Sequence, residues 1–499
     1  MVVAYAAKSK AWLPGMRLPG LGGLPDGKLL SPLFRHQHHH QGEDGSDPRH
    51  LGILAFEVAR TMCRLVALHR ALSDAGVARL RSDAMRSQGV AYLNTPDQGA
   101  LLRLACAEML DDLDAAAAAV ARLGSRCGGV WPQGFEHVYA DLKAGTGDIT
   151  RLGFPPKDVE KRVKKMERYV ASTSALYVAM EGLAELEAGE QRRLGIWKQR
   201  AAAGQKDPPF ESFQKRISLQ RDRVRQLRRE SLWTHSFDKV AELLARSVVS
   251  IFVRICSVYG SFVFQLPQVV LGRHGRPQFA PHCHSHLCSH HHHANPTAGV
   301  YSSGPLERPA VGNVPIRNSG PILRSPARGV PPDAKSWKEQ ALQPAPNTLG
   351  ASGLALRYAK VVALLDKLAR SPELVGKETR EELYWMLPEG MSGAVRAKLR
   401  SHRRMDDGGG GPSEALASGW REALVAILGW LAPMAHDTVQ WHSERSLEQR
   451  ELESEPRVLM LQTLIFSDRE KAETAIVEIL VAFSCVCRYV NGAEDGADC

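Results

Sequence analysis

Four side chains near the C-terminal end have the chemical types that metal binding or general-base catalysis needs. They are His436, Asp437, His442 and Glu444, within the run WLAPMAHDTVQWHSERSLEQRE. Imidazole and carboxylate groups can bind a transition metal or accept a proton. However, His436 and His442 are six residues apart, so a helix directs them to different faces, and the HExxH arrangement is absent. The spacing therefore favours a polar helical segment over a metal or catalytic site.

A second group of metal-ligand types is the His/Cys tract 282–293, within the run PHCHSHLCSHHHH. Cysteine and histidine at this density can bind zinc or another transition metal. The spacing matches no structural zinc motif, and no apolar pattern flanks the tract to build a closed site. We therefore interpret the tract as low-complexity sequence with adventitious metal affinity. The sequence predicts no catalytic residue, no cofactor and no dedicated metal site, and we expect that the protein is not an enzyme.

Basic side chains form the third group. Residues 157–230 contain 18 Lys or Arg and 11 Asp or Glu. Clusters of basic residues can bind nucleic acid or an anionic membrane surface, or can act as a nuclear-import signal. They also suit the solvated flank of a coiled coil, where long basic side chains cover an apolar seam, and the pattern favours this second interpretation. The densest clusters are Lys161, Arg162, Lys164 and Lys165, followed by Arg228 and Arg229.

The composition is that of a chain with a large apolar core. A length of 499 residues predicts two or three domains, and 44% of the residues are hydrophobic. Aromatic residues make up 6%, so Leu, Val, Ala and Met must fill most of the core. A net charge of +10 permits an anionic partner but does not identify one.

The nine cysteines and the N-terminal sequence indicate an intracellular protein. The cysteines are odd in number and scattered, which favours reduced thiols over a disulfide framework. The first twenty residues lack the apolar core of a secretory signal, and Val2 does not fit the N-myristoylation motif. Residues 247–264 are the most apolar stretch, but Arg254 interrupts them and favours a buried helix over a membrane span. We expect the nucleus, the cytoplasm or the membrane periphery, and no secretion.

Helical periodicity organises residues 51–266. Apolar residues recur at spacings of three and four over residues 51–72 and 97–123. The most regular stretch is a heptad seam over residues 159–184, and a second seam follows at 213–231. The connection between them is rich in helix breakers. We therefore predict an antiparallel helical hairpin that is similar to a coiled coil.

Residues 347–490 form a second helical region. Residues 348–404 predict three short helices, with a capping box at Thr379 and Glu382 opening the second. A strongly apolar helix follows over 416–431 and is expected to end near Pro433. Another capping box, over residues 467–470, opens the last helix.

Between and around these regions the hydrophobic periodicity disappears. We predict that residues 1–50 and the Pro-, Gly- and His-rich linker 267–346 are disordered, and that 491–499 form a loose acidic tail. The expected fold is all-α: a helical bundle with a long antiparallel hairpin, in which two helical domains, 51–266 and 347–490, are joined by the linker. Helices over 51–72, 416–431 and 472–490 are apolar over a wide face, so we expect the two regions to dock through them.

Several segments together resemble the plant PSK-simulator (phytosulfokine simulator) family, which combines two plant domains of unknown function. The similarity covers about residues 51–260 and 347–490, and Val2 places the chain near members that lack the N-myristoylation signal. The resemblance implies a non-enzymatic regulator or scaffold with protein partners, which promotes growth in peptide-hormone signalling. The alternative is a basic helical protein that binds nucleic acid or an anionic membrane. The segments are GILAFEVAR, KKMERYV, LRRESLW, LGASGLALRYAKVV, LYWMLPEGM, VQWHSERS and LQTLIFSDREKAE.

Overall fold

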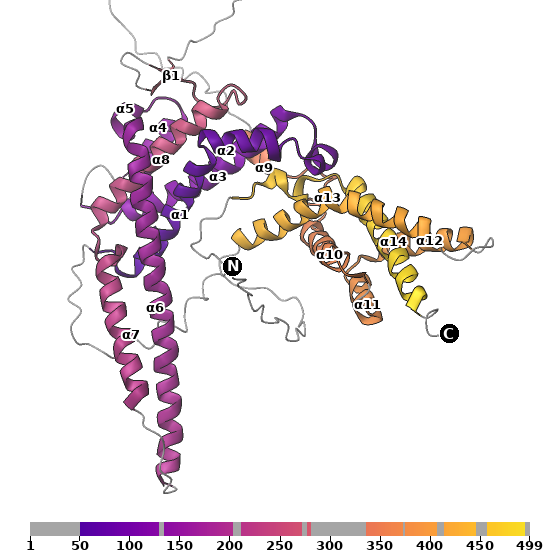
Figure 1. The fold of residues 1–499 in the computed structure, drawn as a ribbon. Helices are drawn as coiled ribbons and strands as arrows, with labels where there is room; N and C mark the ends of the chain where they lie inside the picture. Colours follow the sequence, from indigo (N-terminus) through magenta and orange to yellow (C-terminus); the bar gives the residue numbers. More distant parts are fainter. Residues whose placement is uncertain are drawn as a thin grey trace, which may run out of the picture.

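The computed structural model is built almost entirely of helices, which confirms the predicted all-α fold (Figure 1). It describes residues 50–128, 134–202, 211–271, 277–280, 336–372, 375–406, 414–445 and 457–494. Three predictions of disorder concern residues outside these ranges. They cover most of residues 1–50, the centre of the linker and the end of the tail. No helix in the described ranges is long and apolar enough to cross a membrane.

The first half is a bundle around α3 (Gln98–Gly124), which packs against α1 (Ala55–Ala71) and α8 (Phe237–Tyr259). The side chain of Asp97 caps α3 by accepting a hydrogen bond from the Gly99 amide at 2.8 Å. The apolar stretch that includes Arg254 lies mainly in α8 and is buried in this bundle, as predicted. Smaller elements complete the half: η2 (Gly52–Leu54), α2 (Asp74–Arg79), π-helical turns η3 (Leu80–Ala84) and η4 (Val90–Asn94), α4 (Phe135–Lys143), α5 (Ile149–Leu152) and η5 (Leu232–Thr234).

The predicted hairpin consists of α6 (Pro156–Ala202) and α7 (Glu211–Glu230), which run antiparallel and project from the bundle (Figure 1). In α7 the predicted seam is correct, because Ile217 and Val224 are buried. Polar contacts also join the arms: Gln220 donates to the Ala179 carbonyl at 2.8 Å, and Arg221 pairs with Glu187 at 2.9 Å.

The long seam of α6 is divided between two partners, which the periodicity did not reveal. Its first part packs against α1 and α8 in the main core, and α7 covers the later part. In that later part Leu176 is buried, whereas Tyr177, which continues the heptad spacing of the predicted seam seven residues after Val170, is 44% exposed. The buried stripe therefore moves by one residue where α6 changes partner. The buried seam residues of the first part are Val163, Met166 and Val170.

The prediction of disorder over residues 267–346 is wrong at both ends of that range. Strands β1 (Val269–Leu271) and β2 (Pro277–Phe279) form a small antiparallel sheet, with Val270 opposite Gln278. At the other end, α9 (Trp337–Leu342) begins with a capping box formed by Ser336 and Glu339. Residues 281–335, with the His/Cys tract 282–293, lie outside the described residues.

The second half contains α10 (Ala355–Leu368), α11 (Lys377–Trp385), α12 (Glu389–Asp406), α13 (Glu414–Arg445) and α14 (Arg469–Glu494), with 3₁₀ turns η8 (Met460–Gln462) and η9 (Leu464–Phe466). We predicted that this helix would end near Pro433, but α13 continues to Arg445 with the proline inside it. α10 and α14 pack along this long helix and stabilise it. The tail prediction is also corrected, because residues 491–494 still belong to α14.

Two predicted capping boxes in this half are wrong in detail. Helix α11 begins at Lys377, so Thr379 lies inside it. Helix α14 is capped by Asp468, whose carboxylate accepts from the Lys471 amide at 3.0 Å. The hydroxyl of Ser467 instead donates to the Asn94 side chain at 3.0 Å, which is a contact with the first half.

The two halves pack against each other, and one cluster of buried apolar side chains runs through both. The docking that we expected is present, but α3, η4, α9, η8 and η9 supply most of it. Of the helices that we proposed for it, α13 contributes Trp430, whose ring contacts Tyr92 edge-on at 5.4 Å between centroids. Whether 51–266 and 347–490 fold as separate domains stays a prediction.

Three distant segments meet at the start of α14. The amide of Asp468 donates to the Leu93 carbonyl at 2.7 Å, and the Arg469 amide donates to the Asn347 carbonyl at 2.8 Å. Nearby, the chain at Gly350 lies so close to Ile465 that a Cβ atom on Gly350 would meet the Ile465 carbonyl oxygen at 2.6 Å. A side chain at Gly350 would therefore force the backbone apart.

Candidate functional site at the junction of the halves

A cleft of about 1150 Å³ lies where the two halves meet. Helices α1 and α2 with the residues up to Val90 form one wall, and α13 forms the other. Met109 and Asp112 of α3 contribute to its lining, together with residues 457–462. Clefts between domains are common places for binding sites.

Helix α1 presents arginines to this cleft. Its apolar face, with Met62 and Leu65, is fully buried in the first half. A second face of the same helix lines the cleft with Arg60 and Arg64, which are four residues apart, and Arg70 also contributes to the lining. Arg70 also pairs with Glu167 of α6 at 2.7 Å. The α1 wall is therefore basic, and Arg79 of α2 extends it.

Helix α13 presents aromatic and acidic groups on the opposite wall. Trp430, Met434, Asp437, Trp441 and Glu444 follow one another at spacings of three and four, which places them on one face. Burial raises the pKa of Asp437 to about 6, with a further rise from Glu444 and an opposing effect of His436. This carboxyl group therefore changes its charge close to neutral pH.

A buried ionic network adjoins the cleft, which its members Asp112, Trp441 and Arg457 line. Glu108 of α3 is 1% exposed, and its carboxylate accepts from the Trp441 indole N–H at 2.9 Å and from the Met460 amide at 2.6 Å. The Nη2 atom of Arg457 lies 3.6 Å from the same carboxylate and also pairs with Asp112. Because the acids belong to the first half and the donors to the second, this network joins the halves.

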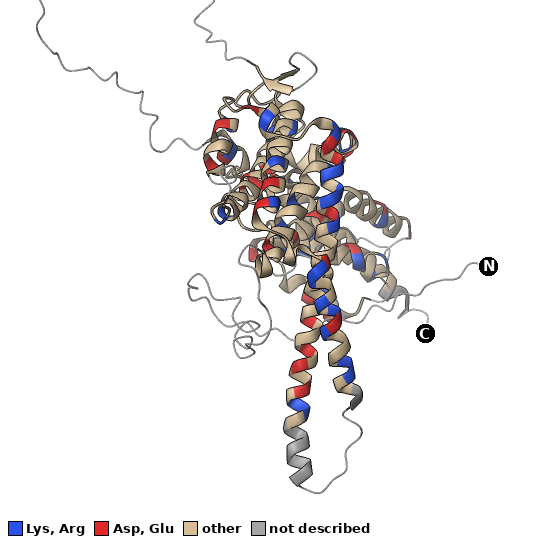
Figure 2. Ribbon diagram, turned by 90° about the vertical axis from the view of Figure 1, so that its left-hand side faces the viewer, with Lys and Arg blue, Asp and Glu red and all other residues tan. Residues whose placement is uncertain are grey.

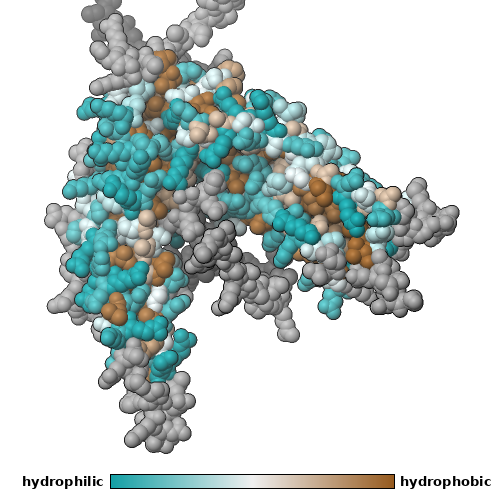
Figure 3. All heavy atoms as spheres, viewed as in Figure 1, coloured by the Kyte–Doolittle hydropathy of each residue, from teal (hydrophilic) through white to brown (hydrophobic). Residues whose placement is uncertain are grey.

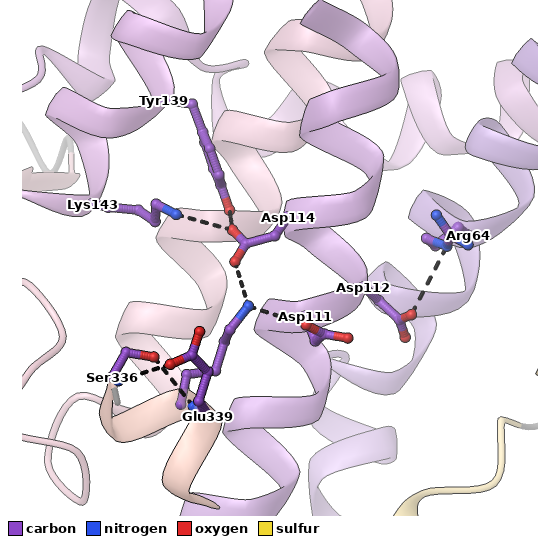
Figure 4. Close-up of polar contacts among 9 residues, drawn as sticks. Arg64, Asp111, Asp112, Asp114, Tyr139, Lys143, Ser336 and Glu339 are labelled. Atoms are coloured by element: carbon purple, nitrogen blue, oxygen red, sulfur yellow. Dashed lines mark hydrogen bonds and ion pairs between the residues drawn. The ribbon is translucent and has the colours of Figure 1, made fainter. Parts of the chain in front are cut away.

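Helix α3 also binds α9, through Lys338 of α9. The Lys338 ammonium donates to Asp114 at 2.7 Å and to Asp111 at 3.1 Å (Figure 4). Asp114 also accepts from the Tyr139 hydroxyl at 2.8 Å and from Lys143 at 3.3 Å. Burial lowers the Lys338 pKa, but the hydrogen bonds to the two aspartates outweigh it and raise the pKa overall. The acidic run of α3 thus holds both α9 and residues 457–460.

The structure does not assemble the four metal-ligand types of α13. His436 turns to Asp366 of α10, at 3.3 Å, and is exposed, whereas Asp437 and Glu444 line the cleft. His442 contacts the neighbouring Trp441 ring. Within the ranges that the structure describes, no three His, Cys, Asp or Glu side chains are placed to hold a metal ion.

The basic clusters of the hairpin are interspersed with acidic residues, and several of their members contact neighbouring side chains (Figure 2). Lys164 pairs with Glu160 at 3.5 Å, and the guanidinium groups of Arg162 and Arg228 lie over the rings of Phe154 and Trp233. Lys165 lies over Tyr169, while Lys161 and Arg229 are exposed. Binding of nucleic acid or an anionic membrane through these residues stays a prediction.

Sequence reasoning missed Glu108, Asp112 and Arg457. The signal for the two acids was their place within the otherwise apolar helix α3, in the run AEMLDDLD. Arg457 lies more than 300 residues away, at the end of the run ELESEPR, and nothing local marks it as the partner.

Two family models match this chain, one on each side of the cleft. One, described as a domain of unknown function (DUF3475), matches residues 53–109, and the other, described as a protein of unknown function (DUF668), matches residues 348–440. Protein PSK SIMULATOR 1 of Arabidopsis thaliana is 23% identical over 442 residues, which cover 86% of this chain and 55% of that protein. The chain is a homologue of the PSK SIMULATOR proteins. This confirms the predicted resemblance.

The other relatives match to a similar extent. PSK SIMULATOR 3 is 23% identical over 437 residues, and PSK SIMULATOR 2 is 21% identical over 442 residues, both from Arabidopsis thaliana and both covering 86% of this chain. The alignments cover 54% and 58% of those proteins, so the chain spans about half the length of its PSK SIMULATOR relatives. No solved structure matches the chain.

Segments on which the PSK-simulator resemblance rests supply both walls of the cleft. GILAFEVAR contributes Arg60, VQWHSERS contributes Trp441 and LQTLIFSDREKAE contributes Gln462. The cleft therefore lies between the two domain types that occur together in this chain.

Proposed function

We propose that this chain is a non-enzymatic regulator or scaffold that promotes growth in phytosulfokine signalling. The observation that carries the proposal is its similarity to three PSK SIMULATOR proteins over 86% of its length. Because the chain spans about half of each relative, it would supply the part of that function that resides in the two helical halves.

The arrangement of the acidic residues supports a non-enzymatic role. Catalytic acids and bases must be able to reach a substrate in the site. Glu108 and Asp112 instead contact Trp441, Arg457 and the backbone of Met460, and so hold the halves together. The family models describe domains without an assigned activity.

Surface features support contacts with other proteins. On the face seen in Figure 3 most residues are hydrophilic, but hydrophobic ones show on the hairpin and on the second half. Val178 of α6 is 63% exposed, Leu219 of α7 is 61% exposed and Val425 of α13 is 69% exposed. The proposal includes an intracellular location, in the nucleus, the cytoplasm or at the membrane periphery. The described cysteines form no disulfide, which supports it.

Complementation in plants tests the proposal. Arabidopsis thaliana lines that lack the three PSK SIMULATOR proteins would express this chain, or PSK SIMULATOR 1 trimmed to its matching region, or an empty vector. We expect the chain and the trimmed relative to restore root growth and its response to added phytosulfokine. If the trimmed relative restores growth and an equal amount of this chain does not, the proposed function is wrong.

A further inference from the structure

We propose that the cleft between α1 and α13 binds a short peptide segment of a partner protein, with acidic side chains of that peptide on the α1 arginines. The inference rests on the proposed scaffold function for its biological meaning, and names the chemistry of the partner that the scaffold would hold. Three features of the cleft support it: a mainly basic wall with two arginines that no described residue pairs, an opposite wall with acidic and aromatic groups, and amide and hydroxyl groups in the lining.

Two arginines of the basic wall carry charge that no described residue neutralises. Arg60 and Arg79 are exposed at the cleft, and neither makes a hydrogen bond or an ion pair with any residue that the structure describes. Arg70 shares Glu167 and remains 46% exposed. A guanidinium group binds a carboxylate with two parallel hydrogen bonds, so this wall suits Asp or Glu side chains.

The opposite wall suits the rest of a peptide. Trp430 and Met434 offer apolar surface, and the carboxyl groups of Asp437 and Glu444 accept hydrogen bonds from N–H groups. A single-sign ligand such as inorganic phosphate would be attracted by one wall and repelled by the other. A peptide carries both kinds of group, because its backbone N–H donors and carbonyl acceptors accompany every side chain.

Polar side chains of the cleft match such a backbone. Ser87, Gln88, Ser443 and Gln462 line it with groups that donate and accept hydrogen bonds. The lining part of α1, from Arg60 to Ala71, is about 16 Å long at ~1.5 Å per residue. An extended peptide rises ~3.3 Å per residue, so about five residues fit along that wall. The volume of about 1150 Å³ exceeds the usual range for a drug-sized ligand, which also favours a peptide.

Peptide selection on the intact protein tests this inference. A phage library of random twelve-residue peptides would be selected on the full-length chain and counter-selected on the variant Arg60→Glu/Arg79→Glu. Both arginines are exposed and unpaired within the described chain, so the variant is expected to fold. Each recovered peptide would be synthesised with a fluorescein label, and its Kd measured by fluorescence anisotropy.

Two further variants make the result specific. Arg151→Glu/Arg216→Glu changes the net charge equally, at exposed arginines of α5 and α7 that do not line the cleft. Gly429→Trp adds bulk to the α13 wall without any charge, and no atom lies within 4 Å of the Cβ position at Gly429. Circular dichroism would confirm that each variant keeps its helices.

We expect the selected peptides to be enriched in Asp and Glu. Their affinity should fall at least tenfold in Arg60→Glu/Arg79→Glu and in Gly429→Trp, and change less than twofold in the control. The inference is wrong if no peptide distinguishes the cleft variants from the natural chain, or if the peptides that do so lack acidic residues. It is also wrong if sedimentation shows a dimer that both cleft variants abolish, because a second copy would then fill the cleft. If peptides bind as expected and plant growth is not restored, the proposed function fails and the cleft assignment stands.

Discussion

Replacement of Glu108 by alanine provides the sharpest test of how the halves are held together. The carboxylate is buried and accepts hydrogen bonds from Trp441 at 2.9 Å and from the Met460 amide at 2.6 Å, with Arg457 at 3.6 Å. Alanine leaves both N–H groups buried without this acceptor and removes one of the acids that face the guanidinium group. Burial lowers the pKa of Arg457 and Glu108 opposes that effect, so the charged arginine depends on its acidic neighbours.

The expected loss of stability follows from these contacts. A hydrogen bond to a charged group contributes about 1.5–3 kcal/mol, and removal of one member of a buried ion pair costs about 3–5 kcal/mol. Since Asp112 still pairs with Arg457, we expect Glu108→Ala to lower the free energy of unfolding by about 3–4 kcal/mol. The control is Glu57→Ala, because Glu57 is 52% exposed and pairs with Arg122 at the surface. It should change the free energy by less than about 1 kcal/mol.

Urea unfolding would be followed by tryptophan fluorescence and by far-ultraviolet circular dichroism. Trp441 lies in the network, so fluorescence reports the junction directly, whereas circular dichroism reports all helices. A free energy of unfolding for Glu108→Ala within about 1 kcal/mol of the natural chain would refute the reasoning. The halves would then be held by their apolar contacts, and the buried acid would contribute little.

Three further predictions follow from the junction, the linker and the hairpin. As pH rises from 4 to 7, the natural chain should lose about 1–2 kcal/mol of stability, because the raised pKa lets Asp437 hold a proton in the folded state that the unfolded state releases at lower pH. Partial exposure reduces this effect. Asp437→Asn should remove the loss, which urea unfolding at several pH values would measure. Replacement of residues 281–335 by a short Gly/Ser linker should change the melting temperature by less than about 3 °C, because such a composition cannot offset the entropy of ordering; a larger fall would show that the segment is structural. Lys161→Glu/Arg229→Glu should change the affinity for phosphatidylserine vesicles and for duplex DNA less than about twofold at physiological salt, because two charges on a mixed surface are well screened. A loss of affinity of about tenfold or more would instead favour the anionic-partner function.

Local periodicity predicted the helices well, because each apolar stripe is written in consecutive residues. The seam around Ile217 and Val224 is one such case. Periodicity cannot name the partner of a stripe, and for this reason the division of α6 between the core and α7 was missed. Pro433 shows a second limit: it normally breaks an isolated helix, but here packing by α10 and α14 maintains α13 on both sides of it.

The cleft was not predicted, because its walls come from segments far apart in the sequence. Asp437 and Glu444 attracted attention as chemical types, and the structure does bring both to the cleft, but without the histidines. No local pattern marks Arg60, because only the position of α13 turns that face of α1 into a wall. The roles of both groups depend on tertiary contacts that leave no local pattern.

The meeting of Asp468 with Leu93 and Asn347 also governs when the protein can finish folding. Ser467 and Asn94, which bond at this place, are 373 residues apart in the chain. A ribosome adds ~5–20 residues per second, so η4 waits on the order of 20–75 s for its partner to be made. During that time the surface of the first half that will receive Trp430 and η8 is uncovered. We expect ribosome-bound chains that end before residue 457 to remain sensitive to protease at residues 85–95 and to recruit chaperones, and chains that extend beyond the end of α14 to become resistant. Resistance in the shorter chains would show that the first half completes its fold without the second.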